Sequence, residues 1–286
     1  MVTIIKEIAA PLSLAVFLAL PGLVTSAERP IDVISDNSFL IEEAYNQEEG
    51  VVQHIFNGIY TNDLRQLGWT FAFIQEWPVF SQDHQFSFTI PSTHLREDGQ
   101  RENGINDVLL NYRYQALDEE TQGIAFAPRL SLILPTGDRR RGTGYGVVGF
   151  QTNLPFSKKV TANVALHANL GLTYWPHVRM PLDAPGKPLS GRHTLVNYNL
   201  GASGIYAVTE RFNFLLEWLN LWEQRINGGG ERKREFKPFL SPGVRAAVIN
   251  EKELQTVVGV GLPIGLNRRA ENYSVFLYLS VEHKLF

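Results

Sequence analysis

The sequence predicts an all-β protein: an antiparallel transmembrane outer-membrane β-barrel of about 12 strands, with a short N-terminal pre-barrel segment. Three observations favour this fold. Apolar and polar residues alternate along strand-length runs, the connections between the runs alternate between short and long, and the chain begins like an exported protein. In a water-soluble sandwich the apolar face of each strand would meet a second sheet. In an outer-membrane barrel it meets lipid, and the polar face lines the lumen.

The stretch 124–156 shows the alternation of apolar and polar residues on both sides of a loop. It reads as two strands joined by the polar, basic and Gly-rich loop TGDRRRGTG. Leu130, Leu132 and Leu134 share one parity, whereas Arg129 and Ser131 share the other. A period of two is typical of strands with one apolar and one polar face.

Residues 1–27 read as a secretory signal peptide. Lys6 precedes an apolar run that ends in the small residues 25–27, so we expect cleavage before Glu28. An uncleaved membrane anchor is the alternative. After Ala27 no run approaches the roughly 20 apolar residues that a spanning helix needs. The predicted location is therefore the outer membrane of a Gram-negative cell.

Residues 28–49 form a separate, acidic segment without clean alternation. Ser38 is placed to cap a short helix with Glu42 and Glu43 in its first turn. We interpret these residues as a pre-barrel segment that either hangs in the periplasm or lies inside the lumen. The barrel itself is expected to span residues 50–286.

Composition narrows the possible functions. The chain has 286 residues, no cysteine and a formal net charge of -3. This length suits one large β domain, and the near-neutral charge gives no argument for a nucleic-acid partner. Without cysteine there is no disulfide, no thiolate metal site and no lipid-modified N-terminal Cys. The seven histidines are scattered, so we expect no metal site and no cofactor.

Strand-length runs follow one another from Gly50 onward, each close to the 9–11 residues of a tilted transmembrane strand. The clearest is 161–175, where Asn163, His167 and Asn169 face away from the apolar residues. The predicted strands are 50–60, 67–80, 84–93, 105–116, 124–135, 145–156, 161–175, 194–208, 211–223, 236–249, 253–266 and 272–285.

The connections between these runs alternate in length. Short turns are expected at Ser81–Asp83, Asp118–Gln122, Ser157–Lys159, Thr209–Arg211 and Asn250–Lys252. Longer connections are expected at 61–66, 93–104, 136–144, 177–193, 226–234 and 266–271. Counted from a periplasmic N-terminus, every short connection is periplasmic and every long one is outside, which is the outer-membrane pattern.

Aromatic residues near the strand ends agree with two interfacial girdles. Those expected near the outer ends are Trp69, Trp175 and Trp222, and those expected near the periplasmic ends are Tyr114, Phe156 and Phe212. Strands are rich in aromatic residues in any case, so the girdles add support without deciding the fold.

Three blocks of sequence resemble a known family. NGINDVLLNYRYQ (103–115) and PRLSLILPTGD…GTG (128–144) resemble the phenol meta-degradation-pathway outer-membrane proteins, and SFLIEEAYNQEEGVVQHI (38–55) resembles a subgroup described as transporters. The resemblance covers nearly all of the mature chain and implies an outer-membrane barrel with a transport role and no agreed catalytic residues.

The C-terminal strand resembles a signal for the barrel-assembly machinery, which we expect as a partner. Its terminal Phe286 departs from the pattern, because Leu285 and Val281 carry the apolar parity and Phe286 does not. A bulge near His283 would restore the phase.

Two arginines, Arg113 and Arg129, lie within apolar strands. An Arg on the lipid face costs roughly 2–4 kcal/mol at the midplane, so both should point into the lumen, where antiparallel pairing brings them close together. The other lumen-lining candidates are Lys237, Arg245, Glu217, His167 and Asn169. Two interpretations stay open: a lumen of hydrated, mutually paired charges, and a cationic constriction that selects anionic solutes.

Basic residues gather in the predicted outer loops. They include Arg139, Arg140, Arg141, Arg232, Lys233 and Arg234. Arginine binds phosphate through charge-assisted hydrogen bonds, so we expect these loops to contact lipopolysaccharide as well as outer-membrane lipid. They lack the interleaved aromatic residues of a nucleic-acid site.

An enzyme is not expected. Some outer-membrane barrels are lipases, but His167 with Asn163 or Asn169 is the nearest approach to a triad, and no serine stands beside His167 in its own strand. Twelve strands lie between barrels whose interiors fill with side chains and open porins. The sequence therefore predicts an outer-membrane channel or transporter that passes or binds small solutes, hydrophobic or aromatic ones among them. A structural or surface-binding barrel without transport is the alternative.

Overall fold

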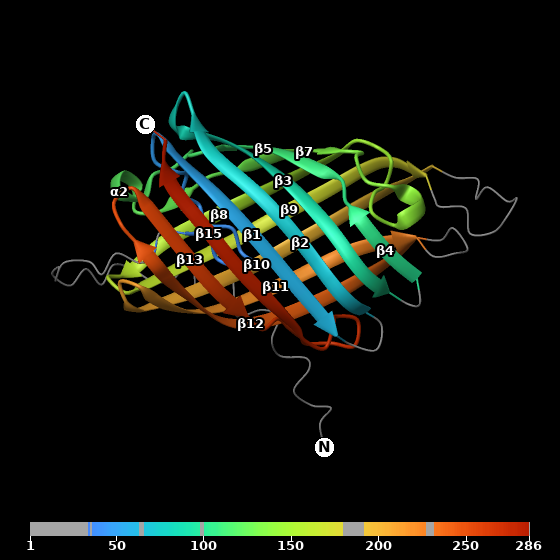
Figure 1. The fold of residues 1–286 in the computed structure, drawn as a ribbon. Coiled ribbons are helices and arrows are strands. Elements are labelled where there is room, and N and C mark those ends of the chain that lie inside the picture. The colour runs from blue at the N-terminus through green and yellow to red at the C-terminus, as the bar shows by residue number, and fades with distance from the viewer. Residues whose placement is uncertain are drawn as a thin grey trace, which may run out of the picture.

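The computed structural model describes residues 34, 36–62, 66–97, 100–179, 192–226 and 232–285. Its strands form one antiparallel sheet that closes on itself, as Figure 1 shows. Closure is made by the first and last strands, whose register runs from Val51 opposite Lys284 to Thr61 opposite Ser274. The predicted all-β barrel is confirmed.

The strands, in chain order, are β1 (Val51–Asn62), β2 (Gln66–Val79), β3 (Ser81–Glu97), β4 (Gln100–Ile105), β5 (Val108–Tyr114), β6 (Ala125–Phe126), β7 (Arg129–Leu134), β8 (Gly149–Thr161), β9 (Val164–Arg179), β10 (Arg192–Thr209), β11 (Phe212–Ile226), β12 (Arg232–Asn250), β13 (Leu254–Gly261), β14 (Ile264–Gly265) and β15 (Ser274–Lys284). Each of the twelve predicted runs is found. Two of them are interrupted, which gives the pairs β6/β7 and β13/β14, and β4 is an additional strand that pairs with β3.

Three predicted connections are wrong. Ser81–Asp83 lies at the start of β3, so that only Phe80 separates β2 from β3. Ser157–Lys159 lies inside β8, and the turn follows at residues 162–163. Most of 93–104 belongs to β3 and β4, which pair with each other beyond the point where β5 leaves β3. In all three places polar residues continue a strand past the apolar band, because ladder hydrogen bonds do not depend on the side chain.

Short helical turns occupy two of the connections. The helix α2 (Glu119–Gln122) is capped by Asp118, whose side chain accepts from the N–H of Thr121. The 3₁₀ turn η1 (Arg139–Arg141) is capped in the same way by Asp138. In Figure 1, α2 and the C-terminus lie toward the same end of the barrel. Within the described ranges, no helix has the length and apolar character to cross a membrane.

The two faces of the wall follow the predicted parity. Leu130, Leu170 and Phe214 are 55%, 52% and 51% exposed on the outside, whereas Ser131 and Asn213 are fully buried on the inside. Outward apolar side chains of this kind form the surface that meets lipid in an outer-membrane barrel.

The aromatic residues follow the girdle prediction only in part. Trp69 stacks on Phe71 and Trp222 on Phe236, on the outward parity. Trp175 faces inward instead, because it shares the parity of Thr173 and lies against Tyr145 with ring centroids 4.8 Å apart. Its indole has room there because residue 149 is a glycine.

The bulge expected near His283 is absent. The register of β15 with β1 is unbroken through Lys284, so the last strand keeps one phase along its described length. Phe286 lies outside the described residues.

Candidate functional site

The barrel lumen is occupied by residue 34 and residues 36–49, which we call the lumen segment. Ile34, Ile41 and Ala44 of this segment are 3%, 1% and 0% exposed. None of its described residues belongs to a strand, and its backbone bonds to side chains of the wall. Of the two positions predicted for residues 28–49, the lumen is therefore the one observed for those that the structure describes.

Inward-facing glycines make sockets for two apolar side chains of the lumen segment. A Cβ on Gly259 would lie 2.4 Å from the ring of Phe39, and one on Gly243 would lie 2.8 Å from it. A Cβ on Gly201 would lie 2.3 Å from Cδ1 of Ile41. These close approaches bury Phe39 against Phe276, with ring centroids 5.1 Å apart. The lumen thus contains an apolar cluster as well as charges.

Arg245 of β12 binds the start of the lumen segment. Its Nη1 donates to the carbonyls of Asp36 and Asn37 at 2.7 and 2.9 Å, and its Nη2 donates to that of Ile34 at 2.8 Å. The same guanidinium lies 3.3 Å from a carboxylate oxygen of Glu43. A buried Arg, 1% exposed, thereby satisfies three carbonyls that the strands do not reach.

Glu217 of β11 binds backbone N–H groups of the lumen segment, as Arg245 binds its carbonyls. One carboxylate oxygen accepts from the N–H groups of Leu40 and Ile41 at 2.8 and 3.1 Å. Asn169 of β9 then accepts from the N–H of Glu42 at 2.7 Å and donates to its carbonyl at 2.7 Å. The irregular backbone of the lumen segment is therefore held by wall side chains.

Arg113 and Arg129 stand directly opposite each other in β5 and β7, as the sequence predicted. Both contact Glu42 of the lumen segment. Arg113 Nη1 lies 3.3 Å from Oε1 and Arg129 Nε lies 3.0 Å from Oε2. The first interpretation expected the charges of the lumen to pair with one another. Arg113 and Arg129 are paired, but their partner Glu42 belongs to the lumen segment and not to the wall.

The pKa values of two carboxyls of the lumen segment, Glu42 and Asp36, are shifted in opposite directions. Burial alone would raise the pKa of Glu42, but Arg129 and Arg113 hold it below its usual value. Burial raises the pKa of Asp36 to about 6, against the opposing effect of Arg245. One oxygen of Asp36 accepts from Gln53 at 2.7 Å, and the other has no hydrogen-bond partner.

His167 lies in the lumen, and here the structure supplies a neighbour that the sequence did not. Ser157 of the adjacent strand β8 places its Oγ 2.7 Å from Nδ1 of His167, and Glu43 lies 3.9 Å from Nε2. The trio does not form a catalytic triad. Ser157 is fully buried, its Oγ accepts from the N–H of Ala44 at 2.7 Å, and Nε2 has no hydrogen-bond partner. We interpret the contacts of Ser157 and His167 with Ala44 and Glu43 as contacts that hold the lumen segment in place.

Lys237 lies apart from the other lumen candidates. Its Nζ lies 3.2 Å from Glu223 and 3.1 Å from Glu271, toward the end of the barrel where the long connections emerge. This residue pairs with wall and loop carboxylates rather than with the lumen segment.

The basic outer loops are described in two places. Arg140 and Arg141 are exposed in η1, and the loop around them is held by Asp107, which accepts from the N–H groups of Gly137 and Tyr145 at 2.9 and 3.1 Å. At the start of β12, Arg232, Lys233 and Arg234 are exposed, and Arg234 lies over the ring of Tyr198 at 5.6 Å.

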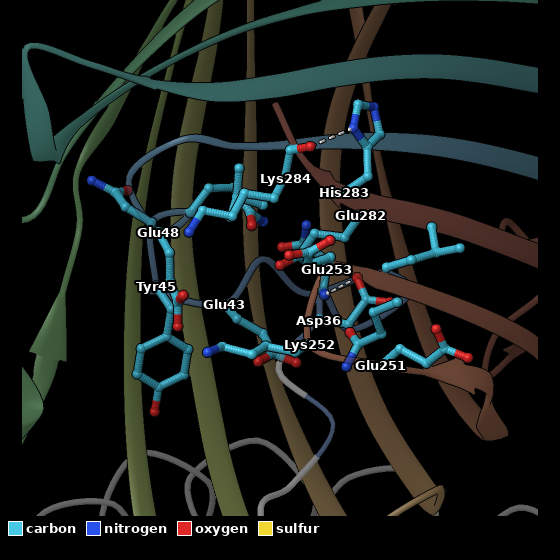
Figure 2. Close-up of a pocket in the computed structure, with 16 residues that line it drawn as sticks. Asp36, Glu43, Tyr45, Glu48, Glu251, Lys252, Glu253, Glu282, His283 and Lys284 are labelled. Atoms are coloured by element: carbon cyan, nitrogen blue, oxygen red, sulfur yellow. Dashed lines mark hydrogen bonds between the residues drawn. The ribbon is translucent and has the colours of Figure 1, made fainter. Parts of the chain in front are cut away.

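Three cavities border the lumen segment. One of about 310 Å³ lies between Leu40, Glu42 and the walls of β1, β2, β5 and β7, and one of about 180 Å³ lies beside Glu42 toward Asn199. The third, of about 220 Å³, lies at the end where β13 and β15 meet the segment. Figure 2 shows its carboxylates, among them Asp36, Glu43 and Glu282, together with Lys252 and Lys284.

Comparison with known proteins agrees with this architecture. A family model described as "Putative MetA-pathway of phenol degradation" matches residues 48–175. The resemblance to that family is confirmed. The match runs from just before β1 into β9, so it covers the strands that carry Arg113, Arg129, Ser157 and His167. A search of curated proteins finds no match.

A solved outer-membrane channel shows the same fold. An outer-membrane channel from Pseudomonas putida F1 superposes with a TM-score of 0.59 at 12% identity, covering 84% of this chain and 97% of that one. The NanC porin gives 0.49 at 10% identity, with 81% and 100% covered, and the KdgM porin gives 0.48 at 9%, with 82% and 99% covered. The likeness to the Pseudomonas putida protein shows that this chain shares the barrel fold of an outer-membrane channel.

Proposed function

We propose that this protein is an outer-membrane channel for small solutes, closed in the observed state by the lumen segment. One observation carries the proposal: the lumen is filled by a non-strand segment that joins the barrel at Gly50, so it could leave without breaking the sheet. Wall strands are paired to their neighbours all round, whereas residues 34–49 are held mostly by side-chain contacts. The location in the outer membrane and the signal peptide belong to the same proposal.

Hydrophobic or aromatic solutes are the finer part of the proposal. The family description supports it by naming phenol degradation. Apolar side chains also line the cavity of about 310 Å³, including Leu40, Ile55, Ile74 and Leu109. Ligand pockets are usually apolar with a few polar groups that orient the ligand, and this cavity has such a composition.

A structural or binding role without transport is the second candidate. The observation in its favour is the number of wall contacts that keep the lumen segment in place, which a permanently closed barrel would also need. An enzyme is not proposed, because Ser157 and His167 lack the geometry of a triad.

An engineered disulfide distinguishes a channel closed by the lumen segment from a barrel without transport. The Oγ atoms of Ser38 and Ser203 lie 3.4 Å apart, and the chain has no cysteine of its own. The variant Ser38→Cys/Ser203→Cys should cross-link the lumen segment to β10 under oxidising conditions. We expect solute flux into liposomes to fall on oxidation and to return on reduction, while the single variants do not respond. Absence of flux under all conditions would favour the non-transport role. Flux that ignores the cross-link would show that the lumen segment is not the closure.

A further inference from the structure

The carboxylate of Glu42 occupies a built anion site. Its Oε1 accepts from Arg113 Nη1 at 3.3 Å and from Arg129 Nε at 3.0 Å. Its Oε2 accepts from Arg129 Nε at 3.0 Å and from Asn153 Nδ2 at 2.7 Å. All of these donors belong to the wall, on β5, β7 and β8, and we call them the Arg113–Arg129–Asn153 cradle.

Part of the cradle is held in place without the lumen segment. Arg129 Nη1 donates to Asn111 at 3.1 Å and also to Ser131, and its Nη2 donates to Gln151 at 3.2 Å. These partners all belong to the wall, so departure of Glu42 would leave the guanidinium oriented. Arg113 differs, because its other bonds go to Asn46 and to carbonyls of the lumen segment.

Charge favours a replacement anion if Glu42 leaves. Around the cradle the wall contributes Arg113, Arg129 and the carboxylate of Glu76, which lines the same cavity as Glu42 and Arg129. With Glu42 in place, two cations face two carboxylates. Without it, one positive charge is in excess in a partly enclosed space where screening by water is weak.

The cavity beside the cradle indicates the rest of the ligand. Its volume of about 310 Å³ is at the lower end of the roughly 300–1,000 Å³ of ligand pockets. Leu40, Ile55, Ile74 and Leu109 supply an apolar wall next to Arg129. A small molecule with an apolar body and one carboxylate would place each part against the matching surface.

We propose that the Arg113–Arg129–Asn153 cradle binds the carboxylate of a small organic acid with an apolar body, and that Glu42 occupies the site in the absence of that solute. The solute then competes with Glu42, which releases one anchor of the lumen segment. This inference rests on the proposed channel function, for which it names a class of solute.

The test measures binding of benzoate to the full-length protein in detergent by calorimetry, with benzamide as its uncharged counterpart. Glu42→Gln removes the competing charge, and we expect benzoate to bind at least tenfold more tightly to it than to wild type. Glu49→Gln is the matched control, because it changes the same charge at an exposed position of the lumen segment. Arg129→Gln should abolish benzoate binding. Retarded or altered migration of unboiled samples on gels checks that each variant forms the closed barrel.

The outcomes are distinct. Equal benzoate affinity in wild type and Glu42→Gln, or equal binding of benzamide and benzoate, would overturn the inference. Flux of a neutral sugar in liposomes is measured in parallel. Flux without any effect of Glu42 on benzoate refutes the carboxylate site and leaves the channel. Benzoate binding that depends on Glu42, in a protein that passes no solute, supports the site and refutes the channel.

Discussion

Arg129 and Leu130 are neighbours in β7 and face opposite sides of the barrel wall. The guanidinium of Arg129 contacts Glu42 inside the lumen, whereas the side chain of Leu130 is 55% exposed on the outer surface. One step along the strand therefore separates a site for charge from a site for lipid.

Moving the charge by one residue should impair assembly. We expect Leu130→Arg to destabilise the barrel by about 2–4 kcal/mol, the cost of an Arg near the bilayer midplane. Tyr112, which pairs with Leu130 and is also exposed, should behave alike as Tyr112→Arg. The measurement is the free energy of unfolding in lipid vesicles. Leu130→Ala controls for loss of apolar area, and normal stability of both Arg variants would mean that this face does not meet lipid.

The wall of the barrel was predictable because each strand carries its own period. Arg113, Arg129, Lys237, Arg245, Glu217, His167 and Asn169 all fall on the inward parity, and the structure places each of them inside. Strand ends were less predictable. Lys158 and Lys159 look like a turn, yet β8 continues through them because pairing with β9 satisfies the backbone.

The contents of the lumen were not predictable from periodicity. Residues 34–49 have no repeat, and many of their partners lie far along the chain, as with Leu40 and Glu217. One signal was available. Gly243, Gly259 and Gly261 share the inward parity of two neighbouring strands, and three such glycines leave a hollow that another side chain must fill. The partner could not be named, because any apolar residue of the acidic segment would have fitted the pattern.

The hollow can be closed by a single methyl group. Gly259→Ala should push Phe39 out of its socket, because the new Cβ would lie 2.4 Å from the ring. We expect the lumen segment to be displaced while the barrel remains closed. The readout is the rate at which a cysteine at the buried position 44, introduced as Ala44→Cys, reacts with a thiol reagent. Gly204→Ala is the control, because its Cβ would meet only Leu166 at 3.6 Å. Equal labelling rates in the two variants would show that Phe39 does not hold the segment.

The orientation of the barrel in the membrane has its own test. Arg140 is exposed in the long connection between β7 and β8, and Lys252 is exposed in the short connection between β12 and β13. We expect Arg140→Cys to react with a membrane-impermeant thiol reagent on intact cells. Lys252→Cys should react only after the outer membrane has been opened. The reverse pattern would place the N-terminus outside and contradict the predicted topology.

The lumen segment should be held more firmly at pH 5 than at pH 7.5, and Asp36 is the reason. Burial raises the pKa of this carboxyl from 3.8 to about 6 in the seated state, although Arg245 and the hydroxyl of Tyr278 oppose the shift. The unseated segment exposes Asp36 to water and returns its pKa to the usual value. The seated state therefore binds the proton more tightly, and lowering the pH through 6 favours seating.

The size of this effect follows from the two pKa values. Seating becomes about tenfold more favourable for each pH unit below the seated pKa of about 6, until the pKa of the unseated carboxyl is reached. Lowering the pH from 7.5 to 5 crosses about one such unit, so it should favour seating about tenfold, or about 1.4 kcal/mol. Glu42 does not oppose the trend in this range, because its pKa is held below its usual value and it stays charged. Other ionisable groups that line the cavity beside Asp36 include Glu43, Glu282, Lys252 and Lys284.

Asp36→Asn isolates the contribution of this one carboxyl. In planar bilayers the open fraction of the wild-type channel should fall about tenfold between pH 7.5 and pH 5, and that of Asp36→Asn should fall by less. Glu49→Gln, which changes an exposed carboxyl of the same segment, should retain the wild-type dependence. An unchanged pH response in Asp36→Asn would assign the titration to another group, and a response of opposite sign would show that protonation loosens the lumen segment.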